Sequence, residues 1–453
     1  MTKTKLRAGE QFSFGIYSFG TILSYYLIMS YLQLYMTNIG IPAAAVAIIF
    51  VVAKVWDAVN DPIFGVMVDK VNFKKGKYLP WLRIATIAIP LSTVFLFVVP
   101  ANASLQVKVL WSSAAYILWD MCYTLCDVPF NALATAMTEE QPERNKLYSL
   151  AAFFTYLGGL LIAIAVPMLF PAIGWGSTAL IIALLCFGAL LPIHFKTKER
   201  YVGAAAQEAS IGDIFRSLVH NKYLLIFTGA SIAGSVTNFA MTLNGYFAIH
   251  CLGSASWMTP LALASSVPFL FVALFVPKLL TKVDKFHAYI VTRVITIAID
   301  IVIYLTGYGN PLRLILLISV KNIFAAVWNV TAMMFIADCI EYGQFHFGQR
   351  NQGIAFSTKA FTNKMIVALT GALAMFGLAA YGFIEGEGAV QSAHTLSGIW
   401  NLYALWPLFG SVISLLIMLF CYKLRDHDVR LMIAVNNGEL ERESAAKQFR
   451  GKF

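Results

Sequence analysis

The sequence is poor in charge and in the motifs of soluble enzymes. Only 12% of its 453 residues are Asp, Glu, Lys or Arg, while 59% are hydrophobic; soluble domains carry roughly a quarter charged residues. Its six cysteines form no CxxC pair, and no HExxH motif occurs. The composition therefore excludes an ordinary soluble domain, and the missing motifs disfavour an intramembrane enzyme.

Long apolar runs fill most of the chain. A helix that crosses about 30 Å of hydrocarbon needs roughly 20 apolar residues. Such runs predict an all-α polytopic membrane protein with twelve transmembrane helices. The predicted spans are 14–37, 41–68, 81–100, 107–134, 148–171, 175–195, 223–250, 257–280, 287–307, 312–338, 352–381 and 397–422.

The basic residues fall on alternate loops. This distribution, with Arg313 as the exception, predicts cytoplasmic loops and two cytoplasmic termini, because Lys and Arg stay on the inner side of the membrane. The net charge of +10 is thereby explained without a nucleic-acid partner. The polar run Met1–Gln11 before the first span is not a cleavable signal, so we expect the first span to remain as a helix.

A polar segment divides the spans into six and six. We predict an N-terminal six-helix bundle at 1–195, a cytoplasmic linker at 196–222, a C-terminal bundle at 223–422 and a cytoplasmic tail at 423–453. Many transporters consist of two such halves, with the solute site between them near the midplane of the membrane. We expect the tail to lie as a surface helix or to stay mobile.

The second span contains two carboxylates where a charge is costly. An ionised side chain at the bilayer centre costs about 2.5 to 3.5 kcal/mol, so it persists mainly beside a cavity or a partner. Asp57 and Asp61 lie one helical turn apart on one face, with Asn60 beside them. Two such carboxylates repel each other unless a cation lies between them. The pair predicts a site for Na⁺ or H⁺, with Asp57 and Asp61 as the metal ligands.

The fourth span carries a polar stripe of Asp120, Thr124, Asp127 and Asn131, spaced by four, three and four residues. We expect it to line a cavity and to bind solute. Thr124 can lend its hydroxyl oxygen to the ion of the second span, and Asp127 can accept hydrogen bonds from solute hydroxyls. For Asp120, contact with interfacial water is the alternative.

Other charged residues suggest coupling and gating. In the eleventh span we expect Lys364, rather than Lys359, to face the cavity and to compete with the bound cation. The tenth span ends in Asp338 and Glu341, which can form a gate by pairing with basic loop residues. In the loop after the second span, Asp69 faces several bases, among them Lys77, and can latch the two bundles together.

Four motifs together resemble the glycoside-pentoside-hexuronide:cation symporters of the major facilitator superfamily. They are Trp56-Asp-Ala-Val-Asn-Asp-Pro62, Tyr123-Thr-Leu-Cys-Asp-Val-Pro-Phe130, Asp338-Cys-Ile-Glu-Tyr-Gly343, and Gly76-Lys77 followed by Pro80-Trp81. The resemblance covers nearly the whole chain. It implies a major facilitator fold that works by alternating access in a bacterial cytoplasmic (inner) membrane.

The resemblance also assigns roles to residues. It implies a cation site at Asp57, Asn60, Asp61 and Thr124, with Na⁺ as the coupling ion and H⁺ or Li⁺ as alternatives. It places Asp127 and Lys364 on the solute side.

The solute side departs from melibiose permease, the best-known type. A first-span acid is replaced near Ile22, an aromatic residue by Asn131 and a fifth-span arginine by Ala152. We therefore expect a different glycoside or polar solute, with Asp120 partly supplying the missing acid.

These observations predict cation-coupled symport of a glycoside or related sugar, with no cofactor besides the ion and with the lipid bilayer as the surroundings. A proton-coupled exporter or lipid-related carrier on the same fold is the alternative among transporters. A membrane sensor that has lost turnover is the alternative from another class.

Overall fold

The computed structural model is helical throughout the part of the chain that it describes, which comprises residues 6–71, 73, 76–100, 102–138, 140–201, 220–280, 283–347 and 352–449. Within these ranges, nine helical stretches are long and apolar enough to cross a membrane. The all-α class predicted from the sequence is confirmed.

The residues cluster into two compact units. The first comprises 1–207, 254–259 and 375–392, and the second comprises 208–253, 260–374 and 393–453. Short segments from the second half of the sequence thus belong to the first unit. The amide of Ala43 donates to Glu385 Oε1 at 2.9 Å, and Thr259 Oγ1 donates to the carbonyl of Ala163 at 2.8 Å.

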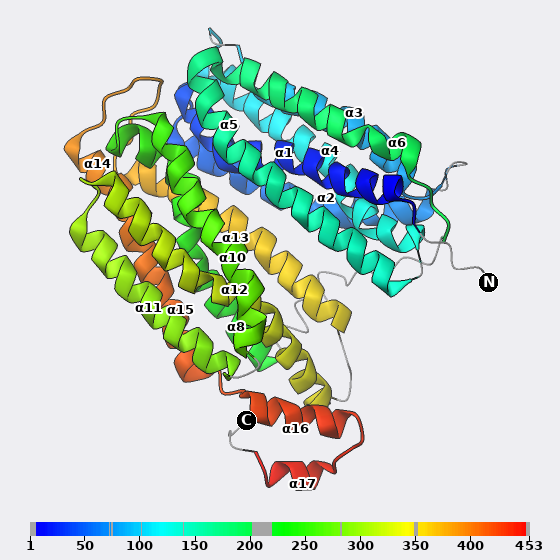
Figure 1. Cartoon of the computed structure of the whole chain (residues 1–453). Helices are drawn as coiled ribbons and strands as arrows, with labels where there is room; N and C mark the ends of the chain where they lie inside the picture. Colours follow the sequence, from blue (N-terminus) through cyan, green and yellow to red (C-terminus); the bar gives the residue numbers. More distant parts are fainter. Residues whose placement is uncertain are drawn as a thin grey trace. The chain divides into compact units, whose positions relative to one another are not determined.

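The first unit is built from six helices (Figure 1): α1 Ala8–Asn38, α2 Ala43–Lys70, α3 Leu79–Leu96, α4 Leu105–Met137, α5 Gln141–Leu190 and α6 Pro192–Lys196. The predicted spans 148–171 and 175–195 both fall in the stretch from α5 to α6. Gly174 separates them, because its φ of 79° and ψ of 166° break the helix there. Only glycine adopts such a conformation without strain.

The second unit is less regular. Its helices are α8 Lys222–Gly234, α9 Phe239–Tyr246, α10 Met258–Leu280, α11 Lys285–Thr306, α12 Pro311–Phe347, α13 Gln352–Ala380, α14 Ala393–Trp400, α15 Trp406–Cys421, α16 Asp426–Asn436 and α17 Arg442–Ala446. Short 3-10 or π turns join several of them: η1 Ser235–Asn238, η2 Phe247–Cys251, η3 Ala255–Trp257, which belongs to the first unit, and η4 Asn401–Leu405. The last residues of α13 also fall in the first unit.

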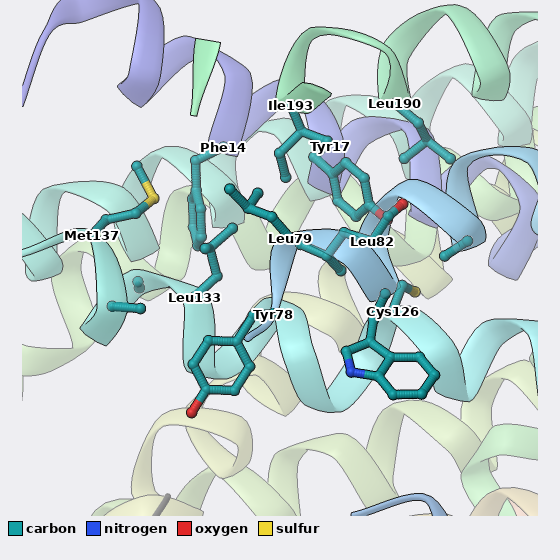
Figure 2. Packing of buried hydrophobic residues seen from close by; sticks show 14 of the residues in the cluster. Phe14, Tyr17, Tyr78, Leu79, Leu82, Cys126, Leu133, Met137, Leu190 and Ile193 are labelled. Carbon is teal, nitrogen blue, oxygen red and sulfur yellow. The ribbon is translucent and has the colours of Figure 1, made fainter. Parts of the chain in front are cut away.

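Buried aromatic and aliphatic side chains hold the first unit together. Figure 2 shows this core, in which residues of α1, α3 and α4 meet Leu190 and Ile193. The ring of Phe14 stacks on Phe130 with 4.4 Å between centroids. The hydroxyl of Tyr17 donates to the carbonyl of Leu82 at 3.2 Å, so the polar end of this buried side chain is satisfied.

Two adjacent glycines let α1 and α5 approach closely. A Cβ atom on Gly158 would collide with Ile22, and one on Gly159 would lie 2.9 Å from Tyr26 Cε2. Close packing of this kind is the usual role of small residues between membrane helices. As a result, Ile22, at the position of the absent first-span acid, is packed against α5.

The C-terminal tail is packed rather than solvated. Helices α16 and α17, drawn in red in Figure 1, follow α15. On α16, Asp428 and Met432 are fully buried, and Asn436 Nδ2 donates to the carbonyl of Glu341 on α12 at 3.1 Å. Of the two expectations for the tail, a helix on the surface of the unit is therefore correct for these residues.

Candidate functional site

Helices α2 and α4 bring the polar residues of the second and fourth spans together. Asn60 Nδ2 donates to Thr124 Oγ1 at 3.1 Å, and Thr124 Oγ1 donates to Asp61 Oδ1 at 3.3 Å. Asn60 and Asp61 follow Asp57 by three and four residues, so each shares a face of α2 with Asp57. Carboxylate, amide and hydroxyl oxygens are hard donors that suit Na⁺. The residues present therefore fit the predicted ion, whose binding stays a prediction.

Lys54 is a part of this site that the sequence interpretation missed. Its Nζ lies 3.4 Å from Asp57 Oδ2 and 3.3 Å from Asp120 Oδ1. The lysine side chain is 14% exposed, and Asp57 and Asp120 are 7% and 5% exposed. The spacing of three residues between Lys54 and Asp57 was a usable signal, because it places both on one helical face.

Three carboxylates gather in this cluster. The ammonium of Lys54 lies between those of Asp57 and Asp120, and that of Asp61 accepts from Thr124. Within the described residues, Asp120 Oδ2 is buried without a hydrogen-bond partner. A buried carboxylate oxygen in this condition is costly unless a donor reaches it, so the cluster can accept both a cation and a hydroxyl donor.

Aromatic side chains lie around the charged cluster. The ring of Tyr123 is 5.4 Å from that of Tyr25 and 5.2 Å from that of Trp119. Trp119 Nε1 donates to Ser24 Oγ at 2.8 Å. Tyr116 OH is buried with no hydrogen-bond partner in the described part of the chain. Apolar ring faces with a few polar groups are typical of sites for small polar molecules.

Asp127 and Asn131 contact each other further along α4. Asn131 Nδ2 donates to the carbonyl of Asp127 at 2.9 Å and lies 3.4 Å from its Oδ1. Both side chains are exposed in the structure. Tyr148 OH donates to the carbonyl of Asn131 at 3.3 Å. The predicted stripe thus has a buried part, Asp120 and Thr124, and an exposed part, Asp127 and Asn131, and its solute-binding role stays a prediction.

The eleventh-span lysines lie on α13. Lys364 is exposed, whereas Lys359 is partly buried and its Nζ lies 2.8 Å from Met333 Sδ. Met333 belongs to α12, so this contact is with a helix and not with a cytoplasmic loop. Lys364 belongs to the second unit, and its pairing with the carboxylates of the first unit stays a prediction.

The loop between α2 and α3 is held by a residue that the sequence did not point to. Glu199 accepts backbone N–H groups from Lys77 at 2.7 Å, from Tyr78 at 2.9 Å and from Leu79 at 2.6 Å. These are orphan donors at the start of α3, where a negative charge is favourable. The side chain of Asp69 lies outside the described residues, so the predicted pairing of Asp69 with the basic residues of this loop stays a prediction.

The acids at the end of α12 have defined partners. Asp338 Oδ2 lies 2.8 Å from Lys285 Nζ, which also lies 2.5 Å from Asp426 Oδ1. Glu341 Oε2 accepts from Asn436 Nδ2 at 3.0 Å. Asp338 thus pairs with a basic residue as expected, while Glu341 contacts the tail. The gating role of both acids stays a prediction.

Asp284, just before α11, stabilises the same region. Burial alone would raise the pKa of its carboxyl group, but N–H donors from His287, Asp426 and Phe286 lower that pKa below its usual value. The carboxylate therefore stays charged where it joins the start of α11 to the tail.

An ion pair and a single arginine inside the second unit were also missed by the sequence interpretation. Lys321 Nζ lies 2.9 Å from Asp300 Oδ1, with Asp300 almost fully buried. Arg293 is 8% exposed and lies over the rings of Tyr289 and Trp328, at 5.7 and 5.6 Å from their centroids. Their positions inside apolar spans were a usable signal, because charges there are costly.

No group of three or more His, Cys, Asp or Glu side chains suited to a metal ion is found in the described ranges. The α2–α4 cluster instead combines three acids with an amide and a hydroxyl. Carboxylates gathered between two apolar helices of an all-helical chain are typical of a secondary transporter.

The comparisons with known proteins agree with this class. The family model described as MFS/sugar transport protein matches residues 13–426, so the chain belongs to the MFS sugar transport family. The predicted resemblance to the glycoside-pentoside-hexuronide:cation symporters is confirmed. The family consists of transporters, and the chain is not an enzyme.

Relatives and solved structures extend over almost the full length. An uncharacterized symporter, YjmB, of Bacillus subtilis (strain 168) is 30% identical, covering 94% of each chain. The isoprimeverose transporter of Lactiplantibacillus pentosus is 27% identical over 91% of this chain and 88% of its own. A crystal structure of the nucleoside transporter NupG superposes with a TM-score of 0.62 at 14% identity, over 91% of this chain and 99% of that one. The last likeness shows the major facilitator fold alone.

Proposed function

We propose that the chain is a cation-coupled symporter that takes up a glycoside or related sugar across the bacterial cytoplasmic membrane by alternating access. The observation that supports this proposal is the gathering of the Asp57, Asp61 and Asp120 carboxylates between α2 and α4, where Asn60 and Asp61 both bond Thr124. Neighbouring carboxylates repel each other, and a cation between them relieves that repulsion. The coupling ion is Na⁺, with H⁺ or Li⁺ as alternatives.

The solute lies beside the ion site in this proposal. Asp120, Asp127 and Asn131 supply carboxylate and amide groups for solute hydroxyls, and Lys364 supplies a positive charge from the second unit. The name of the isoprimeverose transporter supports a glycoside. The lipid bilayer is the only other partner, and no nucleic acid is involved.

Gating completes the cycle. Asp338 with its partner Lys285 closes one side of the second unit, and Asp69 with Lys77 acts in the first. Ion pairs at the ends of helices can open and close as the two halves of a transporter alternate. In this proposal the loops rich in Lys and Arg and both termini lie on the cytoplasmic side.

Uptake into sealed vesicles tests the proposal. Purified protein is reconstituted, and a panel of labelled glycosides is offered under an inward Na⁺ gradient or an inward pH gradient, each imposed separately. We expect at least one glycoside to accumulate under one of the gradients, compared with vesicles in which the gradient is collapsed.

Other outcomes would contradict this function. Accumulation of none of the glycosides under either gradient would refute glycoside symport. Export driven by the pH gradient would favour the exporter alternative, and specific glycoside binding without any transport would favour the sensor.

A further inference from the structure

The ammonium of Lys54 is shared between carboxylates from two helices. Its distances to Asp57 Oδ2 and Asp120 Oδ1 are 3.4 and 3.3 Å. Charge-assisted N–H···O bonds that are fully formed are about 2.7–2.9 Å long. The ammonium therefore lies between its two partners and is not committed to either.

One of these partners belongs to the proposed ion site. Asp57 forms the acidic pair of α2 together with Asp61, whose Oδ1 contacts Thr124. A cation that binds this pair repels the ammonium, because like charges a few ångströms apart in a poorly hydrated site interact strongly. Lys54 and the coupling ion thus compete for Asp57.

Asp120 is built to receive the displaced ammonium. It already accepts from Lys54 through Oδ1. Its second oxygen, Oδ2, is buried and has no hydrogen-bond partner among the described residues. When the ammonium moves away from Asp57, Oδ2 can accept a second N–H bond from the three donors that a lysine carries.

We propose that Lys54 is a tethered cation that alternates with the coupling ion at Asp57, and that Asp120 is the positioning residue that holds Lys54 while the ion is bound. This inference rests on the proposed cation-coupled symport. Without an ion, Lys54 neutralises Asp57; with an ion, it pairs with Asp120. Asp120 therefore sets the affinity for the ion without touching it.

The affinity for the driving ion tests this alternation. The half-saturating Na⁺ concentration for uptake is measured in vesicles for wild type, D120N, K54M and K54M/D120N; H⁺ replaces Na⁺ if only the pH gradient drives uptake. In D120N, Lys54 has Asp57 alone as a partner, so we expect this concentration to rise about tenfold, the effect of roughly one pKa unit of interaction.

The other variants should change the half-saturating Na⁺ concentration differently. K54M removes the competitor and should lower the half-saturating concentration several-fold. K54M/D120N should return it to within about threefold of wild type, because the competitor and its holder are lost together. D120E keeps the carboxylate and should stay close to wild type.

A matched control separates competition from general damage. D300N/K321M removes a buried ion pair from the second unit and should leave the half-saturating concentration unchanged. The K54M result needs no folded D120N, so the inference can still be refuted if D120N fails to reach the membrane.

The outcomes distinguish this inference from the proposed function. Wild-type uptake that depends on no gradient would overturn both. Gradient-driven wild-type uptake with an unchanged ion affinity in K54M, or an ion affinity in D120N that K54M does not restore, would overturn the alternation alone. A D120N variant in which the affinity for the solute changes while the affinity for the ion does not would leave Asp120 with its solute role alone and would also overturn it.

Discussion

The charges between α2 and α4 differ in spacing from those between α11 and α12. In the first region, the ammonium of Lys54 lies 3.4 Å from Asp57 and 3.3 Å from Asp120. In the second region, Lys321 lies 2.9 Å from Asp300 as a balanced pair, and Lys285 lies 2.8 Å from Asp338 and also contacts Asp426. Of these ammonium groups, only those of the second region have a carboxylate closer than 3 Å.

This difference separates two uses of buried charge. A close, balanced pair fastens two helices, and breaking it leaves an uncompensated charge. A cluster of neighbouring carboxylates is stabilised by a cation that lies between them. Arg293 is a further buried charge of the second unit, with aromatic faces around it and Ser414 Oγ 3.5 Å from its Nη2. For these reasons we propose the ion site between α2 and α4 and not between α11 and α12.

Replacing Asp61 should have the largest effect, because it removes a carboxylate from the region between α2 and α4. D61N removes a charged ligand from this cluster, a loss of about 3 kcal/mol or roughly 100-fold in ion affinity. We expect gradient-driven accumulation to disappear while solute exchange without a gradient persists, as measured by counterflow in vesicles. D61E keeps the charge and serves as the control. Normal accumulation of solute by D61N would show that Asp61 is not a ligand of the ion.

Replacing Lys321 tests the balanced region. K321M leaves Asp300 buried beside apolar side chains, and breaking a buried pair in this way costs about 3 to 5 kcal/mol. We expect a lower unfolding temperature in detergent, followed by tryptophan fluorescence, and recovery of most of the loss in D300N/K321M. A K321M transporter of normal stability with altered ion affinity would contradict the fastening role.

Replacing Gly76 should have the smallest effect on stability. It tests a third arrangement of a carboxylate, that of Glu199. Glu199 is satisfied by three backbone N–H donors. A Cβ on Gly76 would lie 2.7 Å from Glu199 Oε1, and the φ of this glycine is +117°. We expect G76A to lose about 2 kcal/mol of stability, partly from the strained backbone and partly from the displaced carboxylate.

The control for this prediction is Gly307, whose φ is +65° and where an added Cβ would meet no atom of the described residues within 4 Å. G307A should lose about 1 kcal/mol, from backbone strain alone. Stability is measured by thermal unfolding. Equal losses of stability in G76A and G307A would show that a Cβ atom at position 76 does not disturb Glu199.

The helices were predictable because the bilayer sets a simple requirement. An apolar run of the right length must form a helix, since hydrocarbon offers no partner to a free backbone group. The boundary between the fifth and sixth spans was also predictable, and the structure has its break at Gly174. The faces of α2 and α4 followed from spacings of three and four residues.

Partners on other helices were not predictable from spacing. The contact of Lys54 with Asp120 joins residues 66 positions apart, and it depends on how α4 is rotated towards α2. No local pattern encodes that rotation. The same reason hid Glu199, which acts on a loop about 120 positions earlier in the sequence. Asp300 and Lys321, by contrast, were visible as charges in apolar spans and were overlooked.

The attachment of Glu199 to the start of α3 gives the first half of the chain a fixed end. Arg200 adds to it by pairing with Glu10 at 2.7 Å. Whatever the following residues do, the chain leaves the first half from one defined point. Such an ending offers a place where the chain could be cut and the two halves expressed separately and rejoined without unravelling the last helix of the first half.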